Sequence, residues 1–211
     1  VFLKLRLDCP EIFFVSGFHF RYYPDSANVE LSPEYLFDKN KIKDHQKAMK
    51  ARVEKLVRPA VTMTELEKEQ YVHDFICQNV RYDKLKKSYS HEILGPLGQG
   101  VGVCEGIAKT VKILCDQLGI WCIVVISEAN QEKNIKYRHA WNIVKIENVW
   151  YEVDATWDDA GSQEDDLTPG TEEYQYFMEA LQDPGYREKL DHFLFLVSTD
   201  TITHFLPGDE Y

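Results

Sequence analysis

No stretch of this 211-residue sequence stays apolar for the roughly 18 residues that a transmembrane helix needs, so no membrane insertion is predicted. A cationic segment followed by a short apolar one is also missing from the N-terminus, so no signal peptide is visible. The chain starts at Val1 and not at Met, and we interpret it as a piece of a longer chain. The cytoplasm is the favoured compartment, while secretion or cell-surface display stays open.

Sequence patterns typical of structural zinc sites are missing as well. Neither C-x-x-C nor H-x-x-x-H occurs, and we predict no metal site and no cofactor. The five cysteines are an odd number at scattered positions, which predicts that most are free thiols: Cys9, Cys77, Cys104, Cys115 and Cys122. Free thiols fit a reducing compartment.

Basic residues are absent from residues 147–186, which contain twelve Asp or Glu. The whole chain has 24 basic and 35 acidic residues and a net charge of −11, so this segment accounts for the entire excess. An acidic chain is not expected to bind nucleic acid. Two interpretations of the segment stay open: a solvated acidic loop, which we favour, and a surface that attracts a cationic substrate. Nothing indicates the oligomeric state.

The N-terminal part shows strand-like and then helix-like periodicity. Alternating apolar residues predict strands over Phe2–Leu7 and Phe18–Tyr22. Residues 38–57 predict a basic helix with a modest apolar stripe. We therefore expect residues 1–60 to form an accessory segment, or part of the same domain, and residues 61–211 to form the core domain.

The centre of the chain predicts two helices followed by strands. Thr64–Glu67 has the pattern of a capping box, which starts the first helix. The second begins near Val103, and Gly119 has the position of a C-terminal cap. The unbroken apolar run Trp121–Ile126 predicts a strand buried on both faces. Helices grouped before strands predict an α+β fold.

Cys104 stands at the start of the second helix, directly after the glycine-rich stretch 95–102. Unpaired backbone N–H groups and the helix dipole stabilise a thiolate at such a position. The same N–H groups are suited to receive an oxyanion. We interpret Cys104 as a reactive thiol, whereas an inert buried thiol is the favoured interpretation of Cys77, Cys115 and Cys122.

A predicted hairpin brings a histidine and an aspartate together. If Glu147-Asn148 form its turn, Trp141 lies opposite Asp154, and His139 and Asp154 are diagonal neighbours on one face, roughly 7–8 Å apart. A carboxylate in that position orients an imidazole. Alone, the pair could also be a hydrogen bond of the core. With Cys104 upstream, the order Cys, His, Asp favours a catalytic set.

Three motifs carry a resemblance to a known family. Gly102–Gly106, His139–Asn142 and Tyr151–Asp159 resemble those of the bacterial transglutaminase-like superfamily, and the resemblance covers about residues 65–160. It implies a papain-like α+β fold in which a helix carrying the nucleophile packs on an antiparallel sheet. No segment matches the calcium-binding loops of the animal enzymes, so calcium dependence is not implied.

The resemblance also implies roles for the three residues. Cys104 would be the nucleophile, His139 the general base and acid, and Asp154 the residue that orients His139. The implied reaction is acyl transfer on a peptide or protein amide through a thioester, resolved by water or by an amine. Hydrolysis and transamidation share the intermediate and stay open. The alternative is a non-catalytic binding module that retains the fold.

Three further residues are candidates by analogy. Gln99 is a candidate second donor to the oxyanion, and a plain surface glutamine is the alternative. Trp141 and Trp157 are candidate walls of the cleft, although large aromatic residues are equally common in cores.

Overall fold

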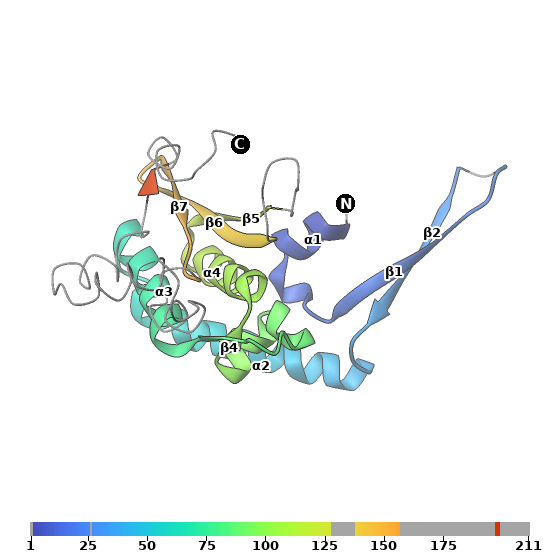
Figure 1. Ribbon diagram of the computed structural model, residues 1–211, viewed down its shortest axis with the longest axis horizontal. Helices are drawn as coiled ribbons and strands as arrows, with labels where there is room; N and C mark the ends of the chain where they lie inside the picture. The colour runs from blue at the N-terminus through green and yellow to red at the C-terminus, as the bar shows by residue number, and fades with distance from the viewer. Residues whose placement is uncertain (1, 26, 128–137, 157–196, 199–211) are drawn as a thin grey trace, which may run out of the picture.

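A computed structural model describes residues 2–25, 27–127, 138–156 and 197–198 (Figure 1). The helices are α1 Phe2–Asp8, α2 Lys39–Val57, α3 Glu65–Asn79 and α4 Cys104–Leu118, with shorter helical turns at Pro10–Ile12, Arg58–Ala60, Ser88–His91 and Leu94–Gln99. The strands are β1 Val15–Tyr22, β2 Val29–Tyr35, β3 Arg81–Tyr82, β4 Val101–Gly102, β5 Trp121–Ser127, β6 His139–Ile146, β7 Val149–Val153 and β8 Val197–Ser198. The predicted α+β class is confirmed.

The helix α4 lies at the centre of the fold. It packs against β5 and β6 on one side and against α2 and α3 on the other, so that it lies between the sheet and these two helices (Figure 1). Its apolar residues are buried, among them Ile107, Val111 and Leu114. A helix enclosed on several sides is buried nearly all round, and even Lys109 and Thr110 are inaccessible to solvent.

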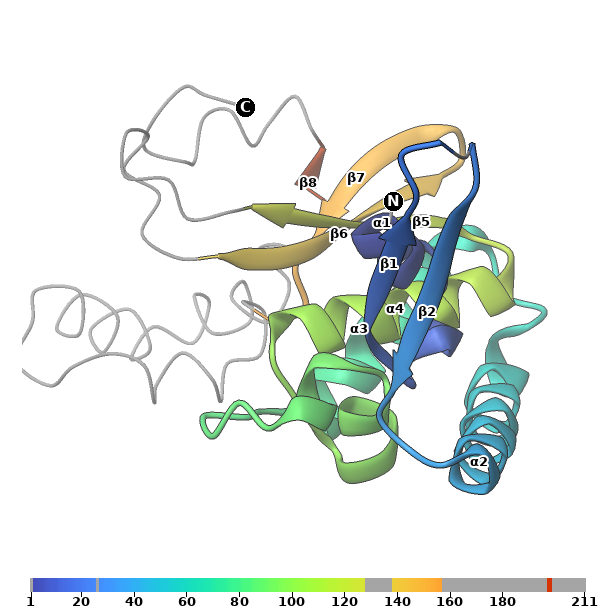
Figure 2. The ribbon, with the colours of Figure 1, turned by 90° about the vertical axis from the view of Figure 1, so that its right-hand side faces the viewer.

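The main sheet has the strand order β5-β6-β7-β8 with every neighbouring pair antiparallel (Figure 2). Along β6 the burial alternates strictly, and Ala140, Asn142 and Val144 are on the buried side. Ile146 pairs with Val149 across the turn, which confirms the predicted register of the hairpin. The opposite face of β6 therefore carries His139 and Trp141.

The predicted helix ends are confirmed. Thr64 and Glu67 form both hydrogen bonds of a capping box at the start of α3. Asp38 caps α2 by accepting hydrogen bonds from the N–H groups of Asn40 and Lys41. Gly119 ends α4 with a left-handed φ of +78°, which is readily available to glycine.

The prediction of a strand over Phe2–Leu7 is wrong, because these residues belong to the helix α1. Leucine, lysine and arginine all have high helix propensity, and the six-residue alternation is too short to outweigh it. Lys4 and Asp8, one helical turn apart, form an ion pair at 3.1 Å. Leu7 is buried, which anchors the helix to the body.

The strand predicted over Trp121–Ile126 exists as β5, but it is not buried on both faces. Trp121 is 71% exposed and Ile123 is also exposed, while Cys122 between them is buried. Among the described strands β5 is at the sheet edge, and only its inner face covers α4. An unbroken apolar run therefore did not indicate burial here.

Residues 1–60 do not form a separate layer. Their helix α2 packs against α4, and Phe13 belongs to the same hydrophobic core as Val111. By contrast, β1 and β2 form a hairpin that projects from the body (Figures 1 and 2). The boundary between an accessory segment and a core domain near residue 60 stays a prediction.

The tight packing around α4 predicts the effect of a single added methyl group. A Cβ atom at Gly106 would overlap the backbone carbonyl oxygen of Ser90 and lie 3.0 Å from its carbonyl carbon. We expect Gly106→Ala to lower the free energy of unfolding by about 2–3 kcal/mol, measured by urea denaturation. Gly98→Ala is the control, because a Cβ there would meet only the Met49 Cε atom, at 3.9 Å. Equal stability of the two variants would contradict this packing.

Candidate active site

His139 and Asp154 form a direct pair at one end of the sheet. His139 is the first residue of β6, and Asp154 directly follows β7. His139 Nε2 lies 2.5 Å from Asp154 Oδ2, and Asp154 Oδ1 accepts a hydrogen bond from the N–H of Thr156. The diagonal relation predicted from the hairpin is therefore present, with the carboxylate held at both oxygens.

The environment of His139 favours its charged form. Burial is the largest influence and lowers the pKa of His139, but hydrogen bonds to Asp154 and Cys104, together with their charges, raise it from 6.5 to about 9. The imidazole is thus protonated at neutral pH. A charged histidine between a carboxylate and a thiol stabilises a thiolate on the sulfur side.

Cys104 is the first residue of α4 and is partly exposed. Its thiol is close enough to His139 to raise the pKa of the imidazole. Because Asp154 occupies Nε2, Nδ1 is the ring nitrogen that remains for the thiol. The cap residue Val103 provides no side-chain hydrogen bond, so the first N–H groups of α4 remain available to an anion beside the sulfur.

The glycine-rich stretch places the start of α4 by close backbone packing. β4 pairs in parallel with β3, and the N–H of Asp83 donates to the carbonyl oxygen of Gly102 at 2.9 Å. A Cβ at Gly102 would lie 2.8 Å from Pro96 Cγ, so only glycine fits without movement of the ring. The N–H of Val103 then donates to Ser90 O at 3.0 Å. Cys104 therefore follows a segment that is fixed on both sides.

Two polar side chains tie α4 to the sheet, and sequence reasoning missed both. Asn142 Nδ2 donates to Ala108 O at 2.9 Å, and Lys112 Nζ donates to Cys122 O at 2.9 Å. These bonds fix α4 relative to β6 and β5, and hence Cys104 relative to His139. The position of Asn142 in the motif His139–Asn142 is the signal that could have revealed the first of them.

Trp141 lies beside His139 on the same face of β6. The two rings are stacked at an interplanar angle of 16° with centroids 5.9 Å apart. Its indole N–H is buried and has no hydrogen-bond partner among the described residues. The pKa of Glu152 on the neighbouring strand is raised, mainly by burial and also by the charge of Asp154, although the nearby indole of Trp141 lowers it. The indole therefore covers the imidazole, consistent with a wall of the site.

The two remaining candidates from the sequence are Gln99 and Trp157. Gln99 ends the π-helical turn Leu94–Gln99, and its side chain is exposed, five residues before Cys104. Its role as an oxyanion donor stays a prediction. Trp157 lies outside the described residues.

A buried cluster of charges next to Cys104 was also missed. The Lys109 ammonium is completely buried and contacts Glu92 at 3.0 Å and Glu105 at 2.8 Å. Arg6 from α1 forms an ion pair with Glu92 and lies 3.9 Å from Glu105. Burial raises the pKa of Glu105, but His91, Lys109 and Arg6 together lower it to about 2. Glu105, the residue after Cys104, is thus always ionised at neutral pH.

This cluster fixes the first turn of the helix that carries Cys104. Lys109 Nζ also donates to the carbonyl oxygen of His91 at 3.1 Å. Towards solvent, Arg138 Nη2 and His91 Nδ1 lie 3.8 Å and 3.7 Å from Glu105 Oε2. A lysine four residues after a glutamate is the signal in the sequence, but the pattern alone does not indicate burial.

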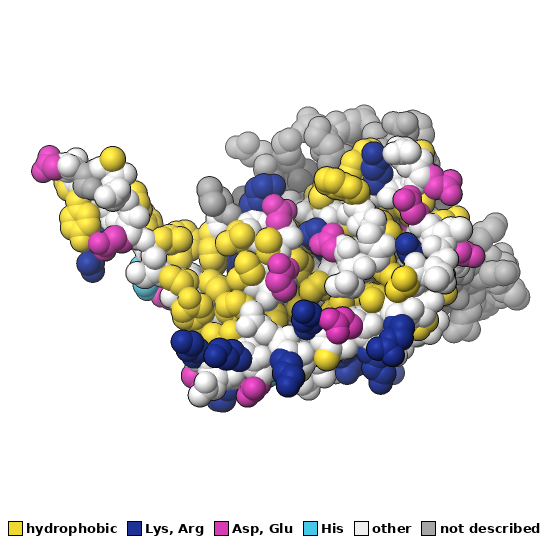
Figure 3. Space-filling view, turned by 180° about the vertical axis from the view of Figure 1, so that it is seen from behind, with side chains coloured by type: hydrophobic (Ala, Val, Ile, Leu, Met, Phe, Trp, Pro, Cys, Tyr) yellow, Lys and Arg dark blue, Asp and Glu magenta, His cyan; other side chains and the backbone are white. Residues whose placement is uncertain are grey.

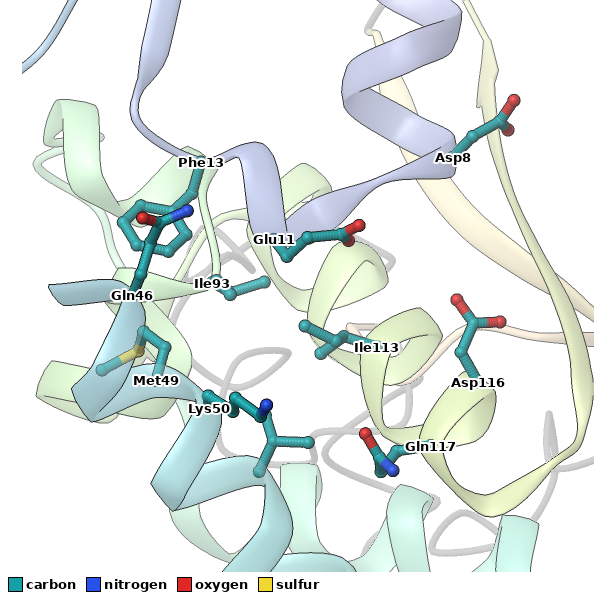
Figure 4. A pocket seen from close by; sticks show the side chains of 11 residues that line it. Asp8, Glu11, Phe13, Gln46, Met49, Lys50, Ile93, Ile113, Asp116 and Gln117 are labelled. Atoms are coloured by element: carbon teal, nitrogen blue, oxygen red, sulfur yellow. The ribbon is translucent and has the colours of Figure 1, made fainter. Parts of the chain in front are cut away.

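A separate pocket of about 500 Å³ lies between α2, the turn Pro10–Ile12 and the second half of α4 (Figure 4). Phe13, Met49 and Ile113 line it together with the carboxylates of Glu11 and Asp116. Asp116 is twelve residues from Cys104, which is about 18 Å along the helix axis, so the pocket is not part of this site. Within the described residues, no group of His, Cys, Asp and Glu is arranged to hold a metal ion, and no helix could cross a bilayer.

Comparison with known proteins gives a family assignment. A family model described as the transglutaminase-like superfamily matches residues 50–155, which is half of the chain. The matched segment includes Cys104, His139 and Asp154.

Among curated proteins, the chain is similar to two proteins named Kyphoscoliosis peptidase. It is 25% identical to the Mus musculus protein over 135 residues and 26% identical to the Homo sapiens protein over 134 residues. These matches cover 58% and 57% of this chain but only 20% of each relative. The chain thus spans about a fifth of their length. The bacterial character inferred from the motifs stays a prediction.

A crystal structure of a TGase is also similar, with a TM-score of 0.44 and 14% identity, covering 76% of this chain and 49% of the other.

The raised pKa of His139 predicts a stability effect with a defined pH window. The pKa of the imidazole is about 9 in the folded chain and near 6.5 without its partners. Its contribution to stability is therefore complete below pH 6.5 and is lost as the pH rises through 9. In Asp154→Asn we expect the pKa of His139 to fall by at least ~1 unit, measured by NMR titration of the ring. We also expect the free energy of unfolding to depend less on pH in this variant.

Glu152→Gln is the matched control for that experiment. Glu152 lies two residues from Asp154 on the same strand face but is not a partner of His139. We expect the pKa of His139 to stay near 9 in this variant. If both variants gave the same titration curve as the unsubstituted chain, the pairing with Asp154 would not be the cause of the shift.

The buried cluster predicts a large cost for the loss of its central cation. Lys109→Met keeps the length of the side chain but leaves the Glu105 carboxylate without its nearest partner and the Glu92 carboxylate with Arg6 alone. We expect the free energy of unfolding to fall by about 3–5 kcal/mol, measured by urea denaturation. Lys4→Met removes the exposed ion pair with Asp8 and should cost less than about 0.5 kcal/mol. Similar costs for the two variants would argue against the cluster.

Proposed function

Since this chain belongs to the transglutaminase-like superfamily, we propose that it is a cysteine-dependent enzyme that transfers the acyl group of a peptide or protein amide. Cys104 is the proposed nucleophile, His139 the proposed general acid and base, and Asp154 the residue that orients His139. The observation that carries this proposal is the continuous series from Asp154 through His139 to Cys104, with the pKa of His139 raised to about 9.

The proposed reaction proceeds in two halves. The thiolate sulfur of Cys104 attacks the amide carbonyl carbon, and the resulting oxyanion is stabilised by the N–H of Cys104 at the start of α4. As the C–N bond breaks, the imidazolium of His139 gives its proton to the leaving amine, and a thioester remains. In the second half His139 takes a proton from water or from an amine, which attacks the thioester and releases Cys104. Gln99 is the proposed second donor to the oxyanion.

The same features argue against the alternative of a non-catalytic binding module. A scaffold has no need for a charged histidine that is bonded to a carboxylate and placed beside a thiol, because burial alone would favour the neutral imidazole. It also has no need for a cysteine that is partly exposed at a helix start with uncapped N–H groups. All three residues of the set are present, which supports a working site.

The substrate is proposed at the level of chemical class only. The relatives named Kyphoscoliosis peptidase support a peptide amide as the acyl donor. The three residues do not determine whether water or an amine is the acyl acceptor, because both resolve the same thioester. A preference for cationic peptides is proposed from the acidic residues 147–186, of which nine carboxylates lie outside the described residues.

The test is alkylation by iodoacetamide between pH 4 and pH 9, followed by peptide mass spectrometry of each cysteine. We expect Cys104 to react at least about tenfold faster than Cys9 below pH 7, because the imidazolium holds it as a thiolate. The Cys9 thiol is an internal control, since burial and then the charges of Glu11 and Asp8 raise its pKa. In His139→Ala the advantage of Cys104 should disappear.

Activity is then measured on a mixture of peptides with and without an added primary amine. We expect Cys104→Ala to remove all turnover while the urea midpoint stays within the error of the unsubstituted chain. If Cys104 alkylates no faster than Cys9 at any pH, the proposed thiolate–imidazolium pair is wrong, and the binding module becomes the better interpretation.

A further inference from the structure

The hairpin of β1 and β2 exposes several large apolar side chains close together. It projects from the body as a two-stranded arm, and its strands pair only with each other among the described strands (Figures 1 and 2). An isolated two-stranded ribbon is at best marginally stable in water. This arm therefore needs additional contacts to persist.

The register divides the arm into two different faces. Phe20 lies opposite Leu31 and Tyr22 opposite Val29, and all of these point to the same side. We call this side the apolar face, and it comprises Phe18, Phe20, Tyr22, Val29, Leu31 and Pro33. The other side is polar: His19 forms an ion pair with Glu34, and Arg21 lies 3.8 Å from Glu30.

The apolar face is largely open to solvent. Four of its side chains are between 63% and 68% exposed: Phe20, Tyr22, Val29 and Leu31. Towards the body the ring of Phe18 contacts that of Phe2 in α1, with centroids 4.6 Å apart, so the face continues onto α1. Figure 3 shows hydrophobic side chains along the arm and around its base.

The size of this surface indicates what can cover it. With on the order of 200 Å² for each large apolar side chain, the exposed parts of the apolar face sum to roughly 500–600 Å² per copy. Two such faces packed together would bury about 1,000–1,200 Å², which is the lower end of specific protein interfaces. Isolated surface hydrophobic residues need no explanation, whereas a contiguous patch of this size is at the upper end of what a typical monomer exposes and is often functional.

We propose that the apolar face of the arm is the contact between two copies of this chain, packed face to face about a twofold axis. A twofold contact places the same surface on both sides, so each face must be complementary to itself. An uncharged face meets this requirement, because it brings no like charges together although each copy has a net charge of −11. The charged residues of the arm lie on the opposite side, where they stay in solvent.

The lack of charge also distinguishes a second copy from other partners. An anionic membrane or an acidic protein would be recognised by lysine and arginine, and the apolar face has neither. At about 1,000–1,200 Å² the contact is small, so we expect a monomer–dimer equilibrium with a dissociation constant on the order of 1–100 μM.

Sedimentation velocity of the whole chain between 1 and 300 μM tests the proposal. We expect the sedimentation coefficient to rise with concentration towards that of a dimer. Leu31→Glu should shift the dissociation constant by at least about tenfold, because it places a charge from each copy in the contact. Ser32→Glu is the matched control: it adds the same charge on the same strand, but on the polar face opposite His19.

A second variant separates loss of the contact from loss of the hairpin. Val29→Glu lies at the other end of the apolar face and should weaken the dimer as Leu31→Glu does, while alkylation of Cys104 stays unchanged in all three variants. A chain that remains monomeric at 300 μM overturns the proposal and leaves the face to another occupant. A dimer that Ser32→Glu disrupts as strongly as Leu31→Glu overturns the assignment to the apolar face.

Discussion

The enclosure of α4 between the sheet and the helices α2 and α3 is the constraint on which the rest of the structure depends. A helix surrounded in this way cannot shift or rotate without loss of packing on both sides. Its first residue, Cys104, is therefore held at a fixed distance from the sheet. Asn142 and Lys112 add hydrogen bonds from β6 and to β5, so the sheet that carries His139 moves with the helix. The geometry of the candidate site is a consequence of how the core packs.

Much of this arrangement was accessible from the sequence because it depends on local patterns. The helix start at Cys104, the cap at Gly119 and the turn at Glu147-Asn148 are each determined by a few neighbouring residues. Once the turn is known, the period of two along a strand places His139 and Asp154 on one face. The proximity of Cys104 to that pair was inferred from the order Cys, His, Asp and from the family resemblance, since no local pattern joins residues 104 and 139.

The features that were missed depend on contacts between distant parts of the chain. Arg6 and Glu92 are separated by 86 residues, and nothing near either residue indicates the other. The helix α1 was mistaken for a strand because six alternating residues are compatible with both structures, and the packing of Leu7 decides between them. The exposure of β5 at Trp121 depends on its place at the sheet edge, which is set by the strand order and not by its own composition.

The distribution of these contacts along the chain has a consequence for the order in which the site assembles during folding. His139 and Asp154 are fifteen residues apart and belong to one hairpin, so their pairing requires the closure of only a short loop. The position of Cys104 depends on the ion pairs of Glu92 with Arg6 and Lys109. These contacts form only when the N-terminal helix docks onto a segment almost a hundred residues away. Local contacts form before distant ones in most small domains. We therefore expect His139 and Asp154 to pair first, and the proposed nucleophile Cys104 to reach its position only when the core has closed. In a partly folded chain, the proposed thiolate would then not yet be beside the imidazole that stabilises it.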